Sequence, residues 1–268
     1  MLKKNIEDKL VCPYDHSRIN IFNKSKNIYY QCVKCSRQYP IIKSIPNFLP
    51  DGLRDWTTKK ILSKKNPTFS AAGNWKPGFR GWSPDFFTKI LSFGIGEGRI
   101  GALEKASTLD VGCGDVAKGN VNTDVYIPNP LPINFILASA ELLPFKNNSF
   151  DIVRSAYVIE HNLYPVEMMT EHVRICRKKV EIYTDNSDWV GVYVYRLLNI
   201  GSIFHDEHYF KWSQEYFKNI LNRQGWKGKV RVFNTSPAFL VRGMSLLGKL
   251  PRIGVIFYRD LYAEISKR

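Results

Sequence analysis

The feature that most constrains the fold is a short apolar segment that runs into two glycines. Residues 107–115 read STLDVGCGD, so Gly112 and Gly114 follow the apolar residues with one residue between them. Glycines at such a position allow a tight turn and let the backbone approach a ligand closely. A second strand-like segment, residues 121–125, carries Asp124 where a carboxylate can hold both hydroxyls of a ribose. Together they predict a nucleotide-binding turn at the end of a parallel strand.

The link between the two segments is short. Nine residues separate Gly114 from Asp124, and the turn is followed neither by a third glycine nor by an amphipathic helix pattern. A standard crossover helix and a full strand would need more residues. We therefore expect the first connection of the sheet to lack its helix.

Strand and helix patterns alternate further along the chain. Residues 150–153 and 180–183 read as buried strands. Between them, residues 165–179 predict a helix that begins at a proline and ends in three basic residues. Residues 215–224 predict another helix, stopped by Gly225. This alternation predicts an α/β fold with a parallel sheet.

Four motifs in this order resemble those of class I S-adenosylmethionine-dependent methyltransferases of the type 11 group. They are LDVGCG (109–114), AELLPF (140–145), SFDIV (149–153) and EH (160–161). The resemblance covers about residues 105–268 and is strongest to short variants with a reduced first helix. It implies a Rossmann-like, mostly parallel sheet with an antiparallel last strand. Residues 229–233 and 261–265 would then form the last two strands, an antiparallel pair at the sheet edge.

The resemblance also implies which residues hold S-adenosylmethionine. The family usually has Asp before Ala at the adenine, so Ser139 replaces a carboxylate with a hydroxyl. The implied contacts are Asp110, Gly112, Cys113 and Gly114 for the methionine part, Asp124 and Val125 for the ribose, Ser139 and Ala140 for the adenine, and Ser155 and Ala156 for the sulfonium.

Three histidines are candidate catalytic bases: His161, His205 and His208. The competing interpretation is that they are packed or solvated. The H-x-x-H spacing of residues 205–208 alone is weak ground for a metal site, because the stretch also resembles the family's segment before its last helix.

The front of the chain carries two cysteine-containing steps. Cys32 and Cys35 form a C-x-x-C step, whereas the earlier step has Cys12 but Asp15 in place of its second cysteine. Paired steps of this kind gather four ligands around zinc. The stretch resembles the short zinc-ribbon domain related to the activator subunit of tRNA and protein methyltransferases. The predicted ligands are Cys12, His16, Cys32 and Cys35, with Asp15 as the alternative fourth ligand and a metal-free ribbon as the competing interpretation.

The net charge of +15 is unevenly distributed. Residues 1–65 carry +9 and residues 187–268 carry +7, whereas residues 109–186 carry −3. The excess therefore lies outside the predicted nucleotide-binding stretch. Solubility alone accounts for such basic ends as well as a nucleic-acid or anionic-membrane partner does.

These observations divide the chain into a zinc-ribbon-like domain (1–50), an aromatic linker and cap (51–105) with a helix at about 84–93, and a methyltransferase domain (106–268). Residues 237–257 are apolar with scattered basic residues, and could lie on a membrane surface or cap a lipidic substrate. No segment is long and apolar enough to span a bilayer, and we expect a cytoplasmic protein with peripheral membrane contact.

Three functions compete. The first is methyl transfer to a small-molecule, glycan or lipid-linked acceptor. The second is RNA methylation with the basic ribbon on the phosphates. The third is a non-catalytic cofactor-binding module, against which the intact glycine turn and Asp124 argue.

Overall fold

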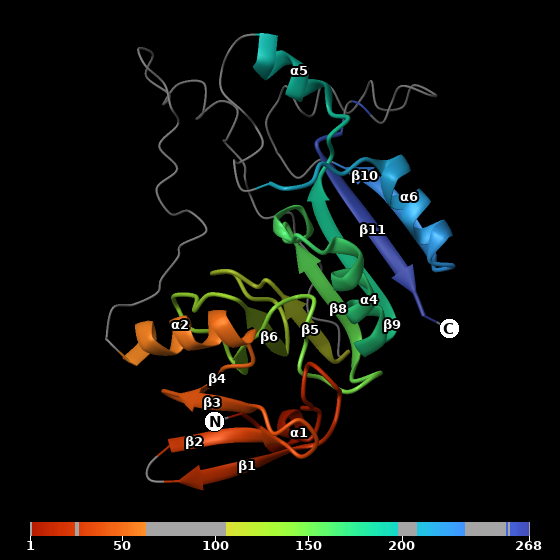
Figure 1. The fold of residues 1–268 in the computed structure, drawn as a ribbon. Coiled ribbons are helices and arrows are strands. Elements are labelled where there is room, and N and C mark those ends of the chain that lie inside the picture. The colour runs from red at the N-terminus through yellow and green to blue at the C-terminus, as the bar shows by residue number, and fades with distance from the viewer. Residues whose placement is uncertain are drawn as a thin grey trace, which may run out of the picture.

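A computed structural model describes residues 2–24, 27–62, 106–197, 208–233, 256 and 258–267. Within these residues the chain forms two sheets, one of four strands and one of seven (Figure 1). The large sheet has the strand order β10-β11-β9-β8-β5-β6-β7. Its strands are β5 (Thr108–Val111), β6 (Val121–Asp124), β7 (Phe135–Leu137), β8 (Phe150–Ala156), β9 (Cys176–Asp185), β10 (Lys227–Phe233) and β11 (Asp260–Ser266).

The direction of the strands confirms the expected fold class. Strands β7, β6, β5, β8 and β9 are parallel neighbours. Strand β11 runs antiparallel to both β9 and β10, so the last strand is inserted against the direction of the rest. Every residue of β5 and β7 is buried, as expected for strands covered on both faces.

Short helices connect the strands of the large sheet. Helix α6 begins after Ser213, whose side chain accepts a hydrogen bond from the Tyr216 backbone N–H at 3.1 Å. It buries Phe217 and Leu221 and ends before Gly225, which has a φ of +67°. The helical segments are η1 (Ile159–His161), α4 (Pro165–Ile175), α5 (Val190–Leu197) and α6 (Gln214–Arg223).

The helix predicted for residues 165–179 is four residues shorter in the structure. Helix α4 ends at Ile175, and the chain passes directly into β9 at Cys176. Arg177 and Lys178 therefore extend from a strand, where their side chains lie 3.2 and 3.5 Å from an oxygen of Asp151 on β8. Arg177 and Lys178, which the sequence places at a helix end, instead form ion pairs with an acid on the neighbouring strand.

The front of the chain forms the small antiparallel sheet, in the order β1-β2-β3-β4. Tyr30 and Tyr39 from its strands stack on Phe48, and all three rings are buried. The stretch expected to be the linker (51–105) begins with a helix, α2. The elements are α1 (Lys4–Glu7), β1 (Ile19–Lys24), β2 (Asn27–Cys32), β3 (Gln38–Ile42), β4 (Ile45–Pro46) and α2 (Asp51–Leu62).

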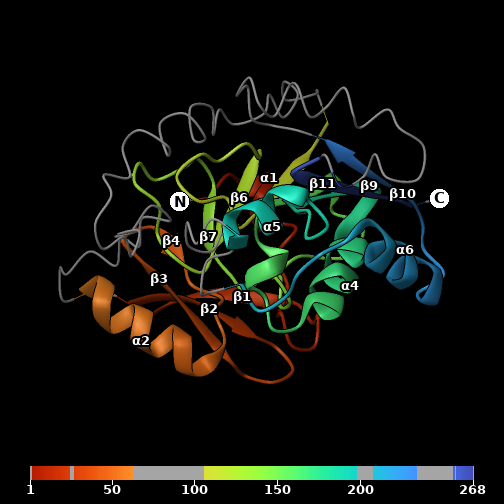
Figure 2. The ribbon, with the colours of Figure 1, turned by 90° about the horizontal axis from the view of Figure 1, so that it is seen from above.

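The connection between β5 and β6 has no helix, as the short spacing predicted. The small sheet packs at this place instead, and Figure 2 shows β4 beside β7. The Phe48 N–H donates to the Leu137 carbonyl at 2.8 Å. One apolar cluster joins the small sheet to the glycine turn and to β7, and its buried members are Ile42, Ile45, Leu49, Cys113, Phe135 and Leu137.

The front segment and the large sheet also share the main hydrophobic core. Cys12, Tyr30 and Phe48 belong to the same buried cluster as Phe145 and Phe150. The Val11 N–H donates to the Pro144 carbonyl at 3.0 Å, and the Lys146 N–H donates to the Lys9 carbonyl at 2.9 Å. Packing therefore holds residues 2–50 against the large sheet over a wide area.

Several expectations concern residues that the structure does not describe. They are the helix at about 84–93, His205, and the apolar stretch 237–257 apart from Ile256. Among the helices that are described, none combines the length and apolar character that crossing a bilayer requires.

Candidate functional site

The glycine turn lies where the β5 strand ends. Gly112 and Gly114 have φ values of +68° and +51°, which side chains disfavour. The N–H groups of Gly112 and Cys113 both donate to the Thr123 carbonyl, at 2.8 and 3.0 Å. The turn is thereby fixed across the end of β6. A Cβ on Gly112 would lie 2.3 Å from the Val158 side chain, whereas nothing lies within 4 Å of one on Gly114.

Asp124 ends β6 directly beside this turn. Its Oδ2 accepts the Gly114 N–H at 2.9 Å, and its Oδ1 accepts the Tyr126 N–H at 3.1 Å. Burial raises the pKa of this carboxyl above its usual range, against the lowering effect of the two backbone donors. A carboxylate keeps further lone pairs for a ligand after these two bonds.

Asp110 is the second acid of the site and lies within β5. Its Oδ2 accepts the Lys118 N–H at 2.8 Å. Burial raises its pKa to about 6, although Arg154 on the neighbouring strand partly opposes that shift. Arg154 itself is held by two hydrogen bonds to Glu181, at 2.9 and 3.2 Å.

The other expected contact residues lie at the ends of the neighbouring strands. Val125 follows Asp124 directly, and Ser139 and Ala140 come just after β7, where the Ala138 N–H donates to the Asp124 carbonyl at 3.0 Å. Ser155 and Ala156 end β8. The Ser155 hydroxyl is buried and has no hydrogen-bond partner within the described ranges. The structure thus brings these residues to one edge of the sheet.

Cys113 occupies a different environment from the rest. Its side chain is buried in the apolar cluster with Leu49 and Leu137, and burial raises its pKa. Only its backbone remains for contact with a ligand.

His161 and His208 come together beyond the end of β8. Their rings lie 4.5 Å apart between centroids and nearly perpendicular, at 86°. Glu160 joins them, since one ligand atom from each of the three side chains lies within 4.8 Å of the others. Burial, followed by the neighbouring Asp185, raises the pKa of Glu160 to about 8. Glu160 was not among the residues singled out from the sequence, although it belongs to the E-H motif.

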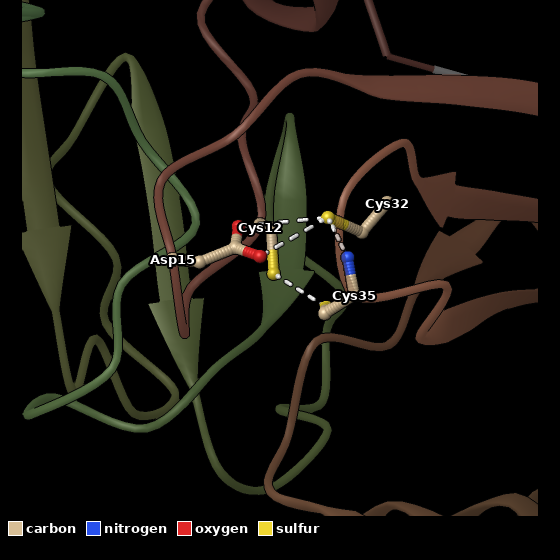
Figure 3. A group of neighbouring side chains, drawn as sticks. All are labelled: Cys12, Asp15, Cys32 and Cys35. Carbon is tan, nitrogen blue, oxygen red and sulfur yellow. Dashed lines mark hydrogen bonds between the residues drawn. The ribbon is translucent and has the colours of Figure 1, made fainter.

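A second cluster lies in the small sheet, between its two cysteine steps. It contains Cys12, Asp15, Cys32 and Cys35 (Figure 3). Cys12 and Cys35 have their sulfurs 3.6 Å apart, and the Cys32 sulfur lies 3.5 Å from both oxygens of Asp15. The backbone N–H of Cys35 donates to the Cys32 sulfur at 3.4 Å.

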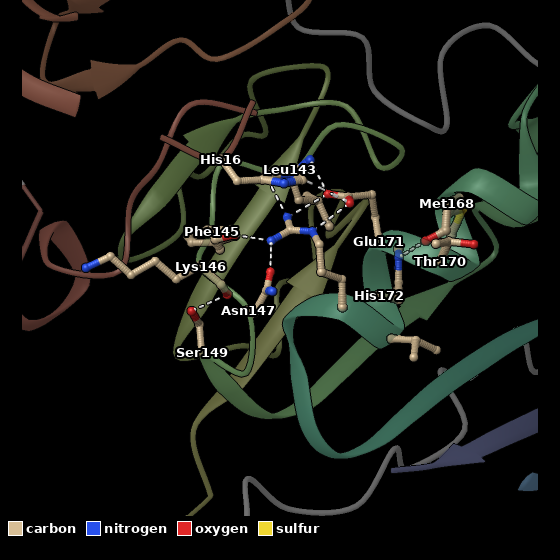
Figure 4. Close-up of polar contacts among 12 residues, drawn as sticks. His16, Leu143, Phe145, Lys146, Asn147, Ser149, Met168, Thr170, Glu171 and His172 are labelled. Atoms are coloured by element: carbon tan, nitrogen blue, oxygen red, sulfur yellow. Dashed lines mark hydrogen bonds and ion pairs between the residues drawn. The ribbon is translucent and has the colours of Figure 1, made fainter. Parts of the chain in front are cut away.

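His16 lies outside this cluster and turns towards the large sheet. Its Nε2 is 3.9 Å from an oxygen of Glu171 on α4 (Figure 4). Glu171 also accepts the Leu143 N–H at 3.3 Å and pairs with Arg174 at 2.7 Å. The fourth position beside the three thiols is therefore occupied by Asp15, the alternative to the histidine predicted from ligand softness.

Comparisons with known proteins agree with this geometry. Residues 91–184 match a family described as "Methyltransferase domain". No curated protein matches the chain. A solved S-adenosylmethionine-dependent methyltransferase from Thermotoga maritima has a TM-score of 0.50 and 17% identity, over 69% of this chain and 95% of its own. Another from Archaeoglobus fulgidus has a TM-score of 0.43 and 18% identity, over 60% and 85% respectively.

The family match shows a methyltransferase domain at residues 91–184, and the chain shares the fold of a solved S-adenosylmethionine-dependent methyltransferase. The hypothesis of a non-catalytic module is therefore set aside.

Proposed function

We propose that this methyltransferase acts on a small-molecule, glycan or lipid-linked acceptor. The observation that carries the proposal is that two chemically different groups of residues lie at the same edge of the sheet. The ends of β5 and β6 carry backbone turns and buried acids, while two imidazoles lie beyond the end of β8. The first environment suits a cofactor and the second suits an acceptor that carries a proton.

In this proposal the cofactor lies along the strand ends. Asp110, Gly112, Cys113 and Gly114 would hold its methionine part, and Asp124 with Val125 its ribose. The adenine would lie at Ser139 and Ala140, and the sulfonium would face Ser155 and Ala156.

The residues present fit such a ligand. The Ser155 hydroxyl is a buried polar group without a partner among the described residues, and such a group is costly unless a ligand or water satisfies it. The space beside Gly114 is open, so the backbone can be approached there. Asp124 retains acceptor capacity for two ribose hydroxyls.

His161 and His208 are the proposed catalytic side chains. When bound, the cofactor supplies a methyl group on a sulfonium, and the electron pair of the broken S–C bond stays on sulfur. The acceptor atom would form the new bond to carbon, and His161 or His208 would accept its proton. His205, the third candidate, lies outside the described residues.

Calorimetry with S-adenosylmethionine and labelled-methyl transfer in a cell extract test this function. We expect saturable cofactor binding, and label in a small or lipid-soluble product. Label only in RNA would refute the proposed acceptor class, and absence of cofactor binding would refute the proposed site.

We further propose that the small sheet is a zinc ribbon with Cys12, Asp15, Cys32 and Cys35 as ligands. A tetrahedral ion with bonds of about 2.3 Å to sulfur and about 2.0 Å to oxygen separates two sulfurs by about 3.8 Å, and sulfur from oxygen by about 3.5 Å. The corresponding distances here are 3.6 and 3.5 Å. Burial raises the pKa of Cys12 to about 12, so zinc would displace a proton from this thiol.

Metal analysis of the purified protein tests the ribbon. We expect about one zinc per chain, lost in Cys32→Ser and kept in His16→Ala. If His16→Ala loses zinc and Asp15→Ala keeps it, the fourth ligand is His16 and the proposed ligand set is refuted.

One observation favours RNA as a second candidate acceptor. A groove of about 480 Å³ between α6 and β10 is lined by Lys218, Lys229 and Arg231 together with Trp226. Cations beside an aromatic ring suit a phosphate backbone and a stacked base. Binding of a labelled single-stranded RNA over a salt series decides: a steep loss of affinity with salt favours this candidate, and no binding at low salt excludes it.

The division of the chain at residues 50 and 105, a cytoplasmic location and peripheral membrane contact through residues 237–257 remain predictions.

A further inference from the structure

A buried carboxylate faces the histidine pair with one oxygen unsatisfied. Glu160 is 2% exposed, and its Oε2 accepts the Thr184 hydroxyl at 3.0 Å. Its Oε1 has no hydrogen-bond partner in the part of the chain that the structure describes. Leaving such an oxygen unpaired in the protein interior is energetically costly. The orphaned atom therefore points to a partner that the protein part of the site does not supply.

Two imidazoles lie close to the Glu160 carboxylate and come from different parts of the chain. His161 follows Glu160 in η1, and His208 belongs to the segment before α6. The Tyr209 N–H donates to the Glu160 carbonyl at 2.9 Å, and the Ser187 N–H donates to the Trp212 carbonyl at 2.8 Å. Backbone hydrogen bonds thus fix the segment that carries His208, so the cluster does not depend on contacts among its own side chains.

We propose that Glu160, His161 and His208 bind one divalent transition-metal cation at the acceptor side of the site. Two imidazole nitrogens and one carboxylate oxygen suit manganese, iron or zinc, and three protein ligands leave positions for another molecule. The cation supplies the missing partner of Glu160 Oε1.

The role of the cation rests on the proposed function, whereas its binding does not. An acceptor hydroxyl that binds the cation loses its proton more readily. In that case the two imidazoles hold the cation, and the proton of the acceptor hydroxyl passes to solvent water instead of to an imidazole. Methyl transfer would depend on the cation, and cation binding would need neither cofactor nor acceptor.

Manganese is the probe that separates this site from the ribbon. Thiolates select zinc, whereas imidazole and carboxylate ligands accept Mn²⁺. The full chain, stripped with a chelator, is titrated with Mn²⁺, and the fall of the free-ion signal is followed by electron paramagnetic resonance. We expect one bound Mn²⁺ per chain, with nitrogen couplings from imidazole in the spin-echo modulation.

Matched variants identify the ligands. Glu160→Gln keeps the shape and an acceptor for Thr184, and His208→Gln changes a more accessible position. Each is expected to weaken Mn²⁺ binding at least about 100-fold, since even outer-shell changes cost 10–100-fold. Glu167→Gln, at an exposed position on α4, is the matched control and should leave the affinity within about twofold of the wild type.

The outcomes separate the two proposals. Equal Mn²⁺ affinity in all three variants, or no binding up to millimolar metal, overturns the metal site, while cofactor binding would still support the function. Tight Mn²⁺ binding without cofactor binding would support the metal site and refute the proposed function. If Glu160→Gln fails to fold, as judged by its thermal transition, the His208 variant and the nitrogen couplings decide alone.

Discussion

Replacing Asp124 by asparagine is a sharp test of the cofactor site, because the side chain is nearly the same size. Both carboxylate oxygens accept backbone N–H groups, from Gly114 at 2.9 Å and from Tyr126 at 3.1 Å. An amide offers one carbonyl oxygen, so its NH₂ group must face one of these two donors. The substitution therefore disturbs the glycine turn and removes the charge that would hold the ribose.

The expected loss follows from the hydrogen bonds involved. Bonds to a charged acceptor are worth about 1.5–3 kcal/mol, against about 0.5–1.5 kcal/mol for neutral ones. Two ribose hydroxyls would then lose about 2–3 kcal/mol in total. This corresponds to cofactor affinity about 30- to 150-fold weaker. Asp124→Ala also leaves the Gly114 N–H without its acceptor, so this variant should bind the cofactor still more weakly.

Isothermal titration with S-adenosylmethionine measures the change. Asp151→Asn is the matched control, because Asp151 lies at the other end of the sheet, where its Oδ2 accepts the Ser107 N–H at 3.1 Å. We expect the control to bind within about twofold of the wild type. Wild-type affinity in Asp124→Asn, with an intact thermal transition, would refute the placement of the ribose.

Three further predictions concern the same molecule. The pKa of Asp110 is raised to about 6 in the folded chain, so its contribution to the free energy of unfolding should fall as pH rises from about 4 to 6, by at most about 1.4 kcal/mol per pH unit. Cofactor affinity should instead rise over pH 5–7, as the carboxyl loses its proton. Urea titrations and calorimetry over this pH range test both, and Asp110→Asn should lose both pH dependences. Gly112→Ala should unfold at lower urea than Gly114→Ala, because only the former meets Val158 in addition to backbone strain of about 1–2 kcal/mol; equal midpoints would contradict it. Asp15→Cys should bind zinc more tightly in competition with a chromophoric chelator, since a fourth thiolate replaces an oxygen; weaker binding would show that the site is shaped for the carboxylate.

The sheet could be predicted from local patterns because its strands are buried on both faces. A short strand-like segment such as the one ending at Val111 is expected in the buried middle of a sheet. The residues that follow it then lie at the carboxyl ends of the parallel strands, where α/β sheets bind their ligands. The short link between β5 and β6 was predictable for the same local reason. The spacing simply leaves no room for a helix.

Long-range contacts were harder to foresee. The end of α4 depends on Asp151, which pairs with Arg177 from a neighbouring strand and so favours an extended chain. The sequence does not indicate a role for Glu160, because its burial and its unsatisfied oxygen arise only when the segment that carries His208 packs against it. Asp15 took the place of His16 because the turn directs the histidine towards Glu171.

The packing of the small sheet on the glycine turn has a consequence for how such a chain can be shortened. A fragment that began at residue 106 would expose Leu137 and Phe135, and it would leave the Leu137 carbonyl without the Phe48 N–H. The outer strand of its sheet would become an open edge, which is a template for aggregation. The front fifty residues therefore serve as a permanent cover for the catalytic half.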